Sequence, residues 1–424
     1  MLTCVVGVNW GDEGKGRMVD LLSETHDIVV RYQGGNNAGH TVINDLGKFV
    51  FNLMPSGILR ENVINILGGG MVVDIEHLHN EITGLRQRGI PVNPSRLLVS
   101  HRAVISMPWH KDVDGFEEDR LGKNKQGSTR RGIGPAYADK ALRKALRMDS
   151  LLDEKYLREQ VEQLVEWKNA TVAKVYSREP YTVEGTMDWL LGFGRPLVPH
   201  IKDTDAFLQN AEKSGKSILL EAQLATLRDV DFGIYPYTTS SSTLASYAPV
   251  GAGLPGRVPD RIVGVVKAYA SSVGGGPFVT EMFGAESDAL REAGSEYGAA
   301  TGRPRRVGAF DLVATRYGTM MQTPTDLVIT KLDVLDNMDE IPVCVKYDID
   351  GELTDSFVTG ARLDRAKPVY IKMKGWKKPT GGCRTESELP KEAREYVDWI
   401  ESNVGVRVSA VSVGAHRDAY IPRG

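Results

Sequence analysis

The sequence opens with Leu2-Thr3-Cys4-Val5-Val6-Gly7-Val8, an apolar run that leads into the polar turn Asn9-Trp10-Gly11-Asp12-Glu13-Gly14-Lys15-Gly16-Arg17. A second polar turn follows, and it reads Gln33-Gly34-Gly35-Asn36-Asn37-Ala38-Gly39-His40. An apolar strand that feeds a glycine-rich loop and then a helix presents backbone N–H groups and a helix N-terminus to phosphate. The opening therefore predicts a buried strand, an anion-binding loop and a helix.

The charged residues of the first turn indicate more than phosphate binding. Lys15 supplies a positive charge for phosphate, whereas the acidic groups of Asp12 and Glu13 suggest a bound Mg²⁺ or a general base. The loop is not a Walker A motif, because that motif needs glycine where the chain has Asn9 and Ser or Thr where it has Gly16. On its own, the loop is also compatible with an ordinary glycine turn.

Composition places the chain among ordinary globular proteins. Of its 424 residues 41% are hydrophobic and 25% are charged, and the net charge of −3 gives no reason to expect nucleic acid or an anionic membrane as a partner. Cys4, Cys344 and Cys383 are odd in number and far apart, which favours free thiols. No stretch resembles a signal peptide or reaches the roughly 18 apolar residues of a membrane span, so we expect a cytoplasmic protein.

Short β-branched runs alternate with amphipathic helical patterns. The expected strands are residues 2–8, 27–31, 63–67, 217–220, 261–268 and 326–330, and the expected helices are residues 153–168, 285–293, 311–319 and 391–402. This alternation predicts an α/β fold with a central, mainly parallel sheet flanked by helices. No repeat or linker interrupts residues 1–424, so we expect one domain with large insertions. Cations at helical spacing in residues 140–147 predict a solvated helix face.

Further motifs carry a resemblance that covers almost the whole chain. They are Gly132-Ile133-Gly134-Pro135-Ala136-Tyr137, Asp229-Val230-Asp231-Phe232-Gly233-Ile234-Tyr235-Pro236, Thr301-Gly302-Arg303-Pro304-Arg305-Arg306 and Thr330-Lys331-Leu332-Asp333. Together with the two opening turns, in this order and with this spacing, they resemble the adenylosuccinate synthetase family. The resemblance implies an architecture similar to that of the P-loop NTPases, and a reaction in which IMP, L-aspartate and GTP give adenylosuccinate, GDP and phosphate.

The resemblance also implies roles in catalysis and in GTP binding. Asp12 matches the general base and a Mg²⁺ ligand, the Gly39 carbonyl matches the second protein ligand, His40 matches the general acid, and Lys15 joins them at the reacting phosphate. The expected GTP-binding residues are Gly11, Glu13, Gly14, Lys15, Gly16, Arg17, Arg305, Lys331, Leu332, Asp333, Ser412 and Gly414. A carboxylate at Asp333 can accept from guanine N1–H and the 2-amino group, which favours GTP over ATP.

The remaining implied residues bind the other two substrates. Those expected at the purine nucleotide are Asp12, Asn37, Ala38, Thr129, Arg143, Gln223, Leu224, Thr239 and Arg303, and those expected at aspartate are Ala299, Ala300, Thr301, Gly302, Arg303 and Arg305. Arginines suit carboxylate recognition, because a guanidinium can pair with a carboxylate bidentately. Arg143 matches a residue that the neighbouring subunit of a homodimer supplies, so the resemblance implies a shared site.

The sequence departs from the family around the nucleotide substrate. The usual Glu-Gly-Ala-Gln-Gly reads Glu221-Ala222-Gln223-Leu224-Ala225, so the glutamine that normally reads the purine 6-oxo edge is Leu224, one place after Gln223. Other departures are Ser128-Thr129-Arg130-Arg131, Ser240-Ser241-Ser242-Thr243-Leu244-Ala245-Ser246-Tyr247 and Ala300. A lost hydrogen bond to O6 is worth about 1–3 kcal/mol, so either Gln223 replaces it or the substrate is not IMP.

Three functions remain open at this stage. The favoured one is IMP–aspartate ligation. The second is ligation of aspartate to another 6-oxopurine nucleotide such as dGMP, as in a related phage branch that makes 2-aminoadenine nucleotides; in that branch the equivalent of Asp12 is often replaced, so Asp12 argues for the first. The third is a guanine-nucleotide-binding protein without catalysis, which the joint presence of Asp12, Lys15, His40 and the arginines disfavours.

Overall fold

A ten-stranded sheet forms the centre of the computed structural model, which describes residues 1–298 and 302–424. The order of its strands is β20-β19-β15-β11-β1-β10-β2-β5-β7-β9, and neighbours are parallel except for β20 beside β19. Their bounds are β1 Leu2–Gly7, β2 Ile28–Arg31, β5 Ile64–Leu67, β7 Leu97–Ser100, β9 Ile201–Lys202, β10 Ile218–Glu221, β11 Arg261–Lys267, β15 Asp326–Thr330, β19 Val408–Ser412 and β20 Tyr420–Pro422.

The central strands are buried on both faces, as their unbroken apolar sequences predict. Every residue of β1, β2, β10 and β15 is buried. On one side Val5 packs with Met18 and Val19 of α1, and on the other Val8 lies in a cluster with residues of α10 and α12. All six expected strands are confirmed, with ends that differ by one residue at most.

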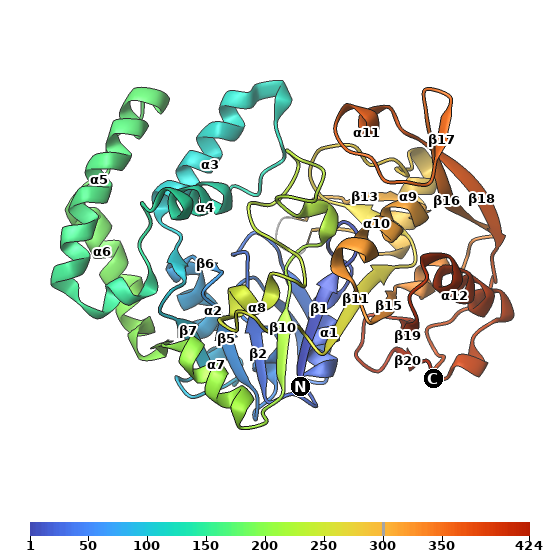
Figure 1. Cartoon of the computed structure of the whole chain (residues 1–424), viewed down its shortest axis with the longest axis horizontal. Coiled ribbons are helices and arrows are strands. Elements are labelled where there is room, and N and C mark those ends of the chain that lie inside the picture. Colours follow the sequence, from blue (N-terminus) through green and yellow to red (C-terminus); the bar gives the residue numbers. More distant parts are fainter. Residues whose placement is uncertain (299–301) are drawn as a thin grey trace.

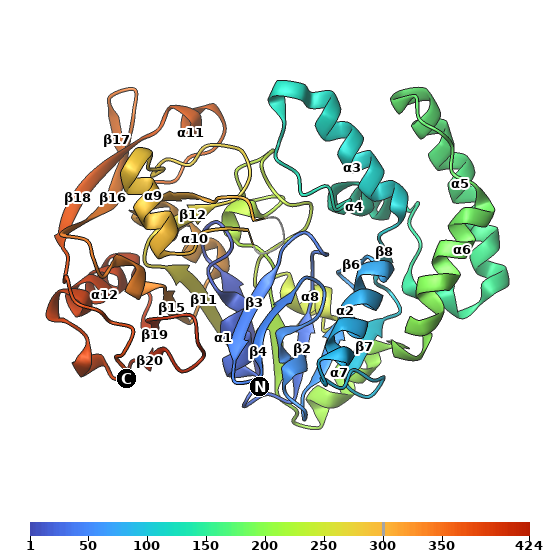
Figure 2. The same cartoon turned by 180° about the vertical axis from the view of Figure 1, so that it is seen from behind.

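Helices cover the sheet and extend beyond it (Figures 1 and 2). They are α1 Lys15–Leu22, α2 Ile75–Gln87, α3 Pro108–Leu121, α4 Ile133–Leu142, α5 Glu154–Tyr176, α6 Val183–Gly194, α7 Thr204–Lys213, α8 Ala248–Ala252, α9 Gly284–Ala293, α10 Leu312–Gln322, α11 Ala361–Arg365 and α12 Lys391–Val404. Helices α3 to α6 stand to one side of the sheet in both views, and both termini lie at its lower edge in Figure 1. The four expected helices are confirmed, and α5 continues eight residues beyond the expected end at residue 168.

Smaller sheets flank the central one. A four-stranded sheet joins β14 Phe310–Asp311, β16 Glu340–Ile349, β17 Glu352–Thr354 and β18 Lys367–Lys374, and two-stranded ladders join β3 His40–Asn44 to β4 Gly47–Phe51, β6 Val72–Val73 to β8 Val104–Ile105, and β12 Ala270–Ser272 to β13 Arg306–Gly308. Strands β16 and β18 lie at the opposite end of the molecule from α5 (Figure 1). The mainly parallel central sheet was predicted correctly, whereas the strands of these smaller sheets were not predicted.

One sequence expectation on the surface is wrong. The basic run 140–147 does not form a continuous helix, because α4 ends at Leu142 and Arg143 adopts a left-handed backbone with φ of 60°.

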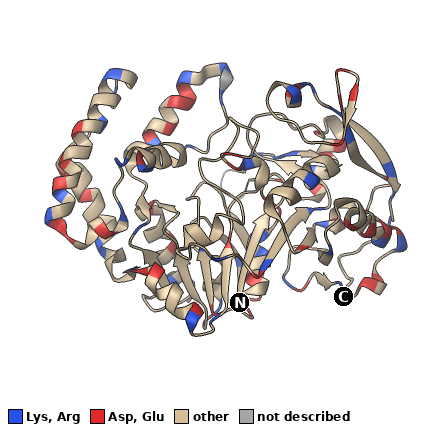
Figure 3. Ribbon diagram, in the orientation of Figure 1, with Lys and Arg blue, Asp and Glu red and all other residues tan. Residues whose placement is uncertain are grey.

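Elsewhere acidic and basic segments are intermixed along α3 and α5 (Figure 3). Among the described residues, no helix combines the length and apolar character needed to cross a bilayer. All three cysteines are free thiols, as expected. The expectation of one domain over residues 1–424 stays a prediction.

Candidate active site

Chemically active side chains gather where the parallel strands of the central sheet end. Because parallel strands share one direction, their carboxyl ends meet at the same edge of the sheet. Arg31 ends β2, Glu221 ends β10, Lys267 ends β11, and Lys331 follows β15, while the loop after β1 carries Asp12. A cavity of about 670 Å³ opens at this edge. Its lining includes Asp12, Glu13, Gly14, Lys15, Gly16, Arg17, Ala38, Gly39, His40, Leu224, Arg305, Lys331, Asp333, Ser412 and Gly414.

The loop between β1 and α1 has the conformation that an anion cradle needs. Gly11, Asp12 and Gly14 all have positive φ, of 103°, 58° and 96°, and α1 begins at Lys15 without a side-chain cap. Its first N–H groups are thus left for another acceptor. In this structure the Glu13 carboxylate accepts from the Gly11 N–H at 2.7 Å and from Lys15 Nζ at 2.8 Å. The predicted strand, glycine turn and helix are therefore present, and Glu13 is ion-paired with Lys15 inside the turn, while phosphate binding stays a prediction.

A buried histidine–glutamate pair lies beside this loop. His40 Nδ1 lies 2.5 Å from Glu221 Oε1, and the same carboxylate accepts from Ser56 Oγ at 2.8 Å and from the Ser56 N–H at 3.0 Å. Burial lowers the pKa of His40, and Arg31 adds to the effect, whereas Glu221 acts in the opposite direction. Burial alone would raise the pKa of Glu221, but His40 and Arg31 hold it below its usual value. Donation from Nδ1–H fixes the tautomer of His40 and leaves Nε2 for chemistry.

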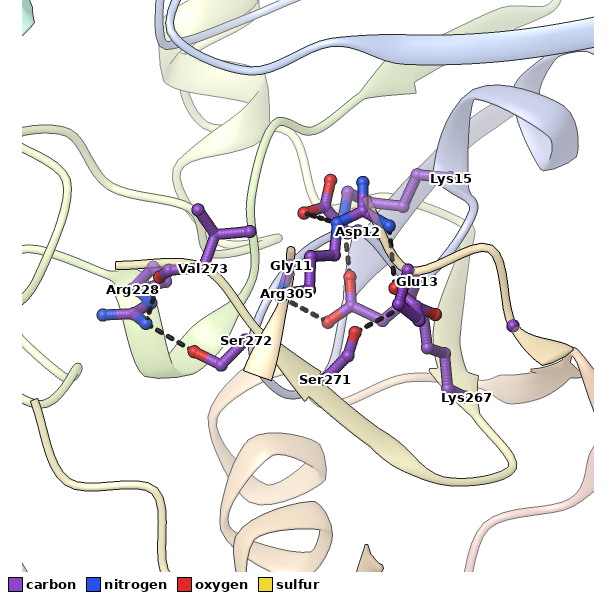
Figure 4. Close-up of polar contacts among 12 residues, drawn as sticks. Gly11, Asp12, Glu13, Lys15, Arg228, Lys267, Ser271, Ser272, Val273 and Arg305 are labelled. Carbon is purple, nitrogen blue, oxygen red and sulfur yellow. Dashed lines mark hydrogen bonds and ion pairs between the residues drawn. The ribbon is translucent and has the colours of Figure 1, made fainter. Parts of the chain in front are cut away.

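Asp12 faces an arginine rather than a second acid (Figure 4). Arg305 Nε lies 3.2 Å from Asp12 Oδ2, an ion pair without the alignment of a hydrogen bond. Arg305 Nη1 also donates to Glu296 Oε2 at 2.8 Å. Among the described residues, no group of three or more His, Cys, Asp or Glu side chains is gathered as a metal site. Asp12 can thus accept a proton or contribute one carboxylate to a cation, next to a guanidinium.

The far end of the cavity is formed by two loops that Arg17 and Lys331 hold in place. Arg17 Nη1 donates to Ser412 Oγ and to the Gly414 carbonyl, and Nη2 donates to the Ala419 carbonyl at 2.7 Å. Lys331 Nζ donates to the Gly294 carbonyl and to Glu296 Oε1. Burial raises the pKa of Asp333. A partly buried carboxylate in the lining of this cavity suits a ligand that presents two N–H donors.

The glutamine next to Leu224 is not directed into the cavity. Gln223 is fully buried; its Oε1 accepts from Arg31 Nη2 at 2.8 Å, and its Nε2 donates to Asn37 Oδ1 at 2.8 Å. Leu224 lines the cavity with a left-handed backbone, φ 62°. Leu224 therefore faces the cavity, and Gln223 has its hydrogen bonds satisfied elsewhere.

Several predicted residues lie outside this cavity. Thr129, Arg143 and Arg303 are exposed, and Thr239 donates its N–H to the Arg228 carbonyl at 2.8 Å. Gly11, Asn37, Gln223, Leu332 and Gly302 do not line the cavity either, although Gly11 and Leu332 belong to the loops that form it. Ala299, Ala300 and Thr301 lie outside the described residues. The expected roles of all these residues stay predictions.

Comparison with known proteins decides the family. The sequence model of the adenylosuccinate synthetase family matches residues 4–421. The chain belongs to the adenylosuccinate synthetase family. It is 45% identical to the adenylosuccinate synthetase of Bifidobacterium adolescentis over 418 residues, which cover 98% of this chain and 97% of that protein. It is also 45% identical to the enzyme of Saccharopolyspora erythraea over 422 residues, 99% of this chain and 98% of that protein.

Solved structures agree with this assignment. The fully ligated adenylosuccinate synthetase of Plasmodium falciparum matches with a TM-score of 0.94 and 34% identity, over 100% of both chains. The succinoaminodeoxyadenylate synthetase of cyanophage S-2L, bound to dGMP and dATP, matches with a TM-score of 0.63 and 18% identity, over 99% of this chain and 94% of that one. The second likeness shows the shared fold alone. The predicted α/β architecture and family are thereby confirmed.

Two acidic residues beside the cavity, Glu221 and Glu296, were not predicted from the sequence. Glu221 belongs to the motif of residues 221–225 but was predicted to have no role of its own, although a carboxylate at the end of a predicted parallel strand was a usable signal. Glu296 stands five residues before the motif that begins at Thr301 and belongs to no sequence pattern of its own. Both are fully buried and paired with cations or a histidine from distant parts of the sequence.

Proposed function

We propose that this chain joins L-aspartate to carbon 6 of IMP with GTP as the energy donor, and that the residues of the cavity divide the work as the family pattern implies. One observation carries the proposal: Asp12, His40 and Arg305 share a single cavity with Lys15 and Asp333. A base, an acid, a carboxylate-binding arginine, a phosphate lysine and a guanine-type acceptor are the groups that this reaction needs together.

The chemistry begins with a poor leaving group, the purine 6-oxo oxygen. Asp12 takes the N1 proton, so that negative charge builds on O6, and O6 then forms a bond to the γ-phosphorus of GTP as the bond from that phosphorus to the β-phosphate oxygen breaks. The aspartate amine next forms the bond to C6, the C6–O6 bond breaks so that phosphate leaves with O6, and the amine gives up one proton, which the leaving phosphate takes. The products are adenylosuccinate, GDP and phosphate.

His40 is suited to support O6 and the phosphoryl group during these steps. Glu221 accepts from Nδ1, which orients the ring and leaves Nε2 as the other nitrogen. A protonated Nε2 donates to the oxygen on which charge develops, and fixed donors of this kind stabilise a transition state without reorganisation. Arg305, with Nε unused as a hydrogen-bond donor, is available to a substrate carboxylate.

GTP is proposed to span the cavity from the loop of residues 9–17 to the loop of residues 412–414. Lys15 and the N–H groups of that first loop receive the phosphates, and Asp333 accepts from guanine N1–H and the 2-amino group. Arg17 acts through Ser412 and Gly414, whose positions it fixes.

Mg²⁺ fits the donor set at the phosphate end of the cavity. Mg²⁺ is commonly held by one or two carboxylates together with waters and substrate phosphates. The Asp12 carboxylate and the Gly39 carbonyl both belong to the cavity lining, and they would hold the ion. When bound, it would supply positive charge for the phosphoryl group in transfer.

The other substrate contacts are carried over from the family pattern. Thr129, Thr239, Asn37, Ala38 and Arg303 are proposed to bind the purine nucleotide. Gly302, Arg303 and Arg305, with the predicted residues 299–301, are proposed to bind aspartate. We further propose a cytoplasmic homodimer in which Arg143 reaches the neighbouring site; its exposed position at the end of α4 supports this role.

A second candidate function has one observation in its favour. Leu224 faces the cavity while Gln223 is bound to Arg31 and Asn37, so no glutamine amide is presented to the purine 6-oxo edge in this conformation. The contact that the family pattern implies for IMP is thus missing here, and another 6-oxopurine nucleotide, such as dGMP, is the alternative substrate; since dGMP has the same 6-oxo edge, a direct comparison of the two nucleotides is needed.

The test is a comparison of substrates. Purified protein with GTP, Mg²⁺ and aspartate is offered IMP or dGMP in separate reactions, and GDP and the succinyl-purine product are measured. We expect turnover with IMP. Turnover with dGMP alone would replace the first proposal by the second, and GTP binding without aspartate-dependent GDP release from either nucleotide would contradict both.

A further inference from the structure

Glu296 is the meeting point of three cations, two of which, Arg305 and Lys331, line the cavity. Its Oε1 accepts from Lys267 Nζ at 2.7 Å and Lys331 Nζ at 3.0 Å, and its Oε2 accepts from Arg305 Nη1 at 2.8 Å. The hydroxyl of Tyr269 donates to Oε1 as well. The carboxylate has no exposed surface, so it is a buried anion whose hydrogen bonds are all supplied by side chains of the site.

The electrostatics of this group depend on its partners being present together. Burial alone would raise the pKa of Glu296, but Lys267, Lys331 and Arg305 hold it far below its usual value. Burial lowers the pKa of Lys267 to about 8 even beside Glu296. Removing the negative charge would leave three cations close together with little water, which is costly for each of them.

Glu296 also fixes the backbone beneath the arginine segment, which we define as residues 302–306. The Arg305 N–H donates to the Glu296 carbonyl at 2.9 Å, and the Gly298 N–H donates to the Arg303 carbonyl at 2.8 Å. Arg291 Nε adds a bond to the Arg305 carbonyl at 3.0 Å. The base of the segment is thus held twice by Glu296, once through its carbonyl and once through its side chain.

Two of the three cations belong to different ends of the cavity. Lys331 precedes Asp333 on the proposed guanine side, and Arg305 lies 3.2 Å from Asp12 on the proposed aspartate side. Both side chains line the cavity. A ligand that moves either Lys331 or Arg305 therefore changes the hydrogen bonds of the same carboxylate. Binding at the guanine side and binding at the aspartate side are thus coupled in free energy, and each must affect the other equally.

We propose that Glu296 is a positioning residue that holds Arg305 over Asp12 and, through Lys331, couples the guanine end of the cavity to the arginine segment. The assignment of the two ends rests on the proposed function. Glu296 itself touches neither substrate; it acts through the cations that do.

The matched control is Asp326, a buried acid at the end of β15 opposite to Lys331. Asp326 begins β15, and Arg261 donates to both of its oxygens, at 2.9 and 2.6 Å. Glu296→Gln and Asp326→Asn each replace a buried, ion-paired carboxylate with an amide of the same shape. Of the two carboxylates, only Glu296 is paired with cations that line the cavity, namely Lys331 and Arg305.

The experiment measures steady-state kinetics and hydrogen exchange on the full-length wild type and both variants. We expect Glu296→Gln to raise the aspartate KM at least about tenfold, while Asp326→Asn changes it by less than about twofold. In the ligand-free protein, the amides of Gly298, Gly302 and Arg305 should exchange at least about tenfold faster in Glu296→Gln and at the wild-type rate in Asp326→Asn. With aspartate saturating, the GTP KM of Glu296→Gln should rise too.

Three results would overturn the proposal: an unchanged aspartate KM in folded Glu296→Gln, an equal change in Asp326→Asn, or unchanged exchange at the amides of Gly298, Gly302 and Arg305. If Glu296→Gln does not fold, Glu296→Asp keeps the charge and shortens the reach; its aspartate KM should then rise at least about threefold. Failure of the proposed function is separate, because it would appear in the wild type as no aspartate-dependent GDP release, and hydrogen exchange would still decide the role of Glu296.

Discussion

The imidazole of His40 and the carboxylate of Glu221 are joined by a 2.5 Å contact between Nδ1 and Oε1, although 181 residues separate them in sequence. Glu221 acts to raise the pKa of His40 against the effect of burial. Glu221→Gln should therefore lower that pKa further and misorient the ring. We expect kcat to fall about 100-fold at neutral pH, with little change in the GTP KM. The pH–rate profile checks this: the alkaline limb, where His40 loses its proton, should move to lower pH.

Ser56 offers a control for that pair. Ser56→Ala removes the hydroxyl that donates to Glu221 at 2.8 Å but keeps the carboxylate and the Ser56 N–H contact. It should reduce kcat by less than about tenfold and leave the alkaline limb in place. An equal loss in Ser56→Ala and Glu221→Gln would indicate that packing, and not the charge on Glu221, is what His40 needs.

Asp12 is the group whose removal should stop the chemistry. Asp12→Asn keeps the size of the side chain but cannot accept the N1 proton, so kcat should fall by about 1,000-fold. Affinity for GDP without added Mg²⁺, measured with a fluorescent analogue, should stay within about threefold of wild type. Undiminished turnover would remove Asp12 from the role of base, and lost GDP binding would show that the loop of residues 9–17 had itself changed.

Local sequence signals predicted the sheet centre and the phosphate loop because both depend on short stretches. Residues 2–8 are apolar without interruption, and the glycines that follow permit the positive φ angles seen at Gly11 and Gly14. The pairings of His40 with Glu221 and of Glu296 with Lys267 depend instead on which strands are neighbours, and one sequence does not state the strand order. Strand β18 was missed because its residues are mostly exposed and its ends are basic, like a loop. Strand β16 was missed although its apolar residues at 341, 343, 345, 347 and 349 alternate, which was a usable signal.

Asp333 is expected to determine the choice of nucleotide. Asp333→Asn replaces an acceptor with an amide that offers N–H groups, so guanine loses its partner and the GTP KM should rise at least about 100-fold. Xanthine presents a carbonyl where guanine has its amino group, and XTP should therefore support the variant better than GTP does. Kinetics with both nucleotides check this, and recovery with XTP also shows that the variant is folded. An unchanged GTP KM would place the guanine elsewhere.

Asp311 gives a prediction about stability and pH. Its carboxylate caps α10 through the Ala314 N–H and accepts from the Tyr347 hydroxyl at 2.7 Å, and burial raises its pKa to about 6. Since this folded-state pKa lies above the usual value, the folded protein binds a proton more tightly than the unfolded chain, and the stabilisation it gives is lost as pH rises through about 6. Asp311→Asn cannot ionise. The Tm of wild type relative to Asp311→Asn should therefore fall between about pH 4 and pH 7, and a constant difference would contradict the shift.

Leu224 is the position at which recognition of the purine 6-oxo edge can be tested. Leu224 has a left-handed backbone with φ of 62° and lines the cavity. Leucine and glutamine are both unbranched at Cβ, so Leu224→Gln adds no backbone strain beyond what is already present. Its amide can hydrogen-bond the 6-oxo edge, and a bond worth about 1 kcal/mol or more should raise kcat/KM for IMP about five- to tenfold.

Leu224→Ala separates the new hydrogen bond from the loss of leucine. It removes the apolar contact without adding an amide, so it should lower kcat/KM for the preferred nucleotide while Leu224→Gln raises the value for IMP. Separate kinetics with IMP and with dGMP measure both effects, because the two nucleotides share the 6-oxo edge and a new hydrogen bond to it should raise kcat/KM for each of them. An unchanged kcat/KM for both nucleotides in Leu224→Gln would mean that the side chain at this position does not face the purine, and that the 6-oxo edge is recognised by other residues of the pocket.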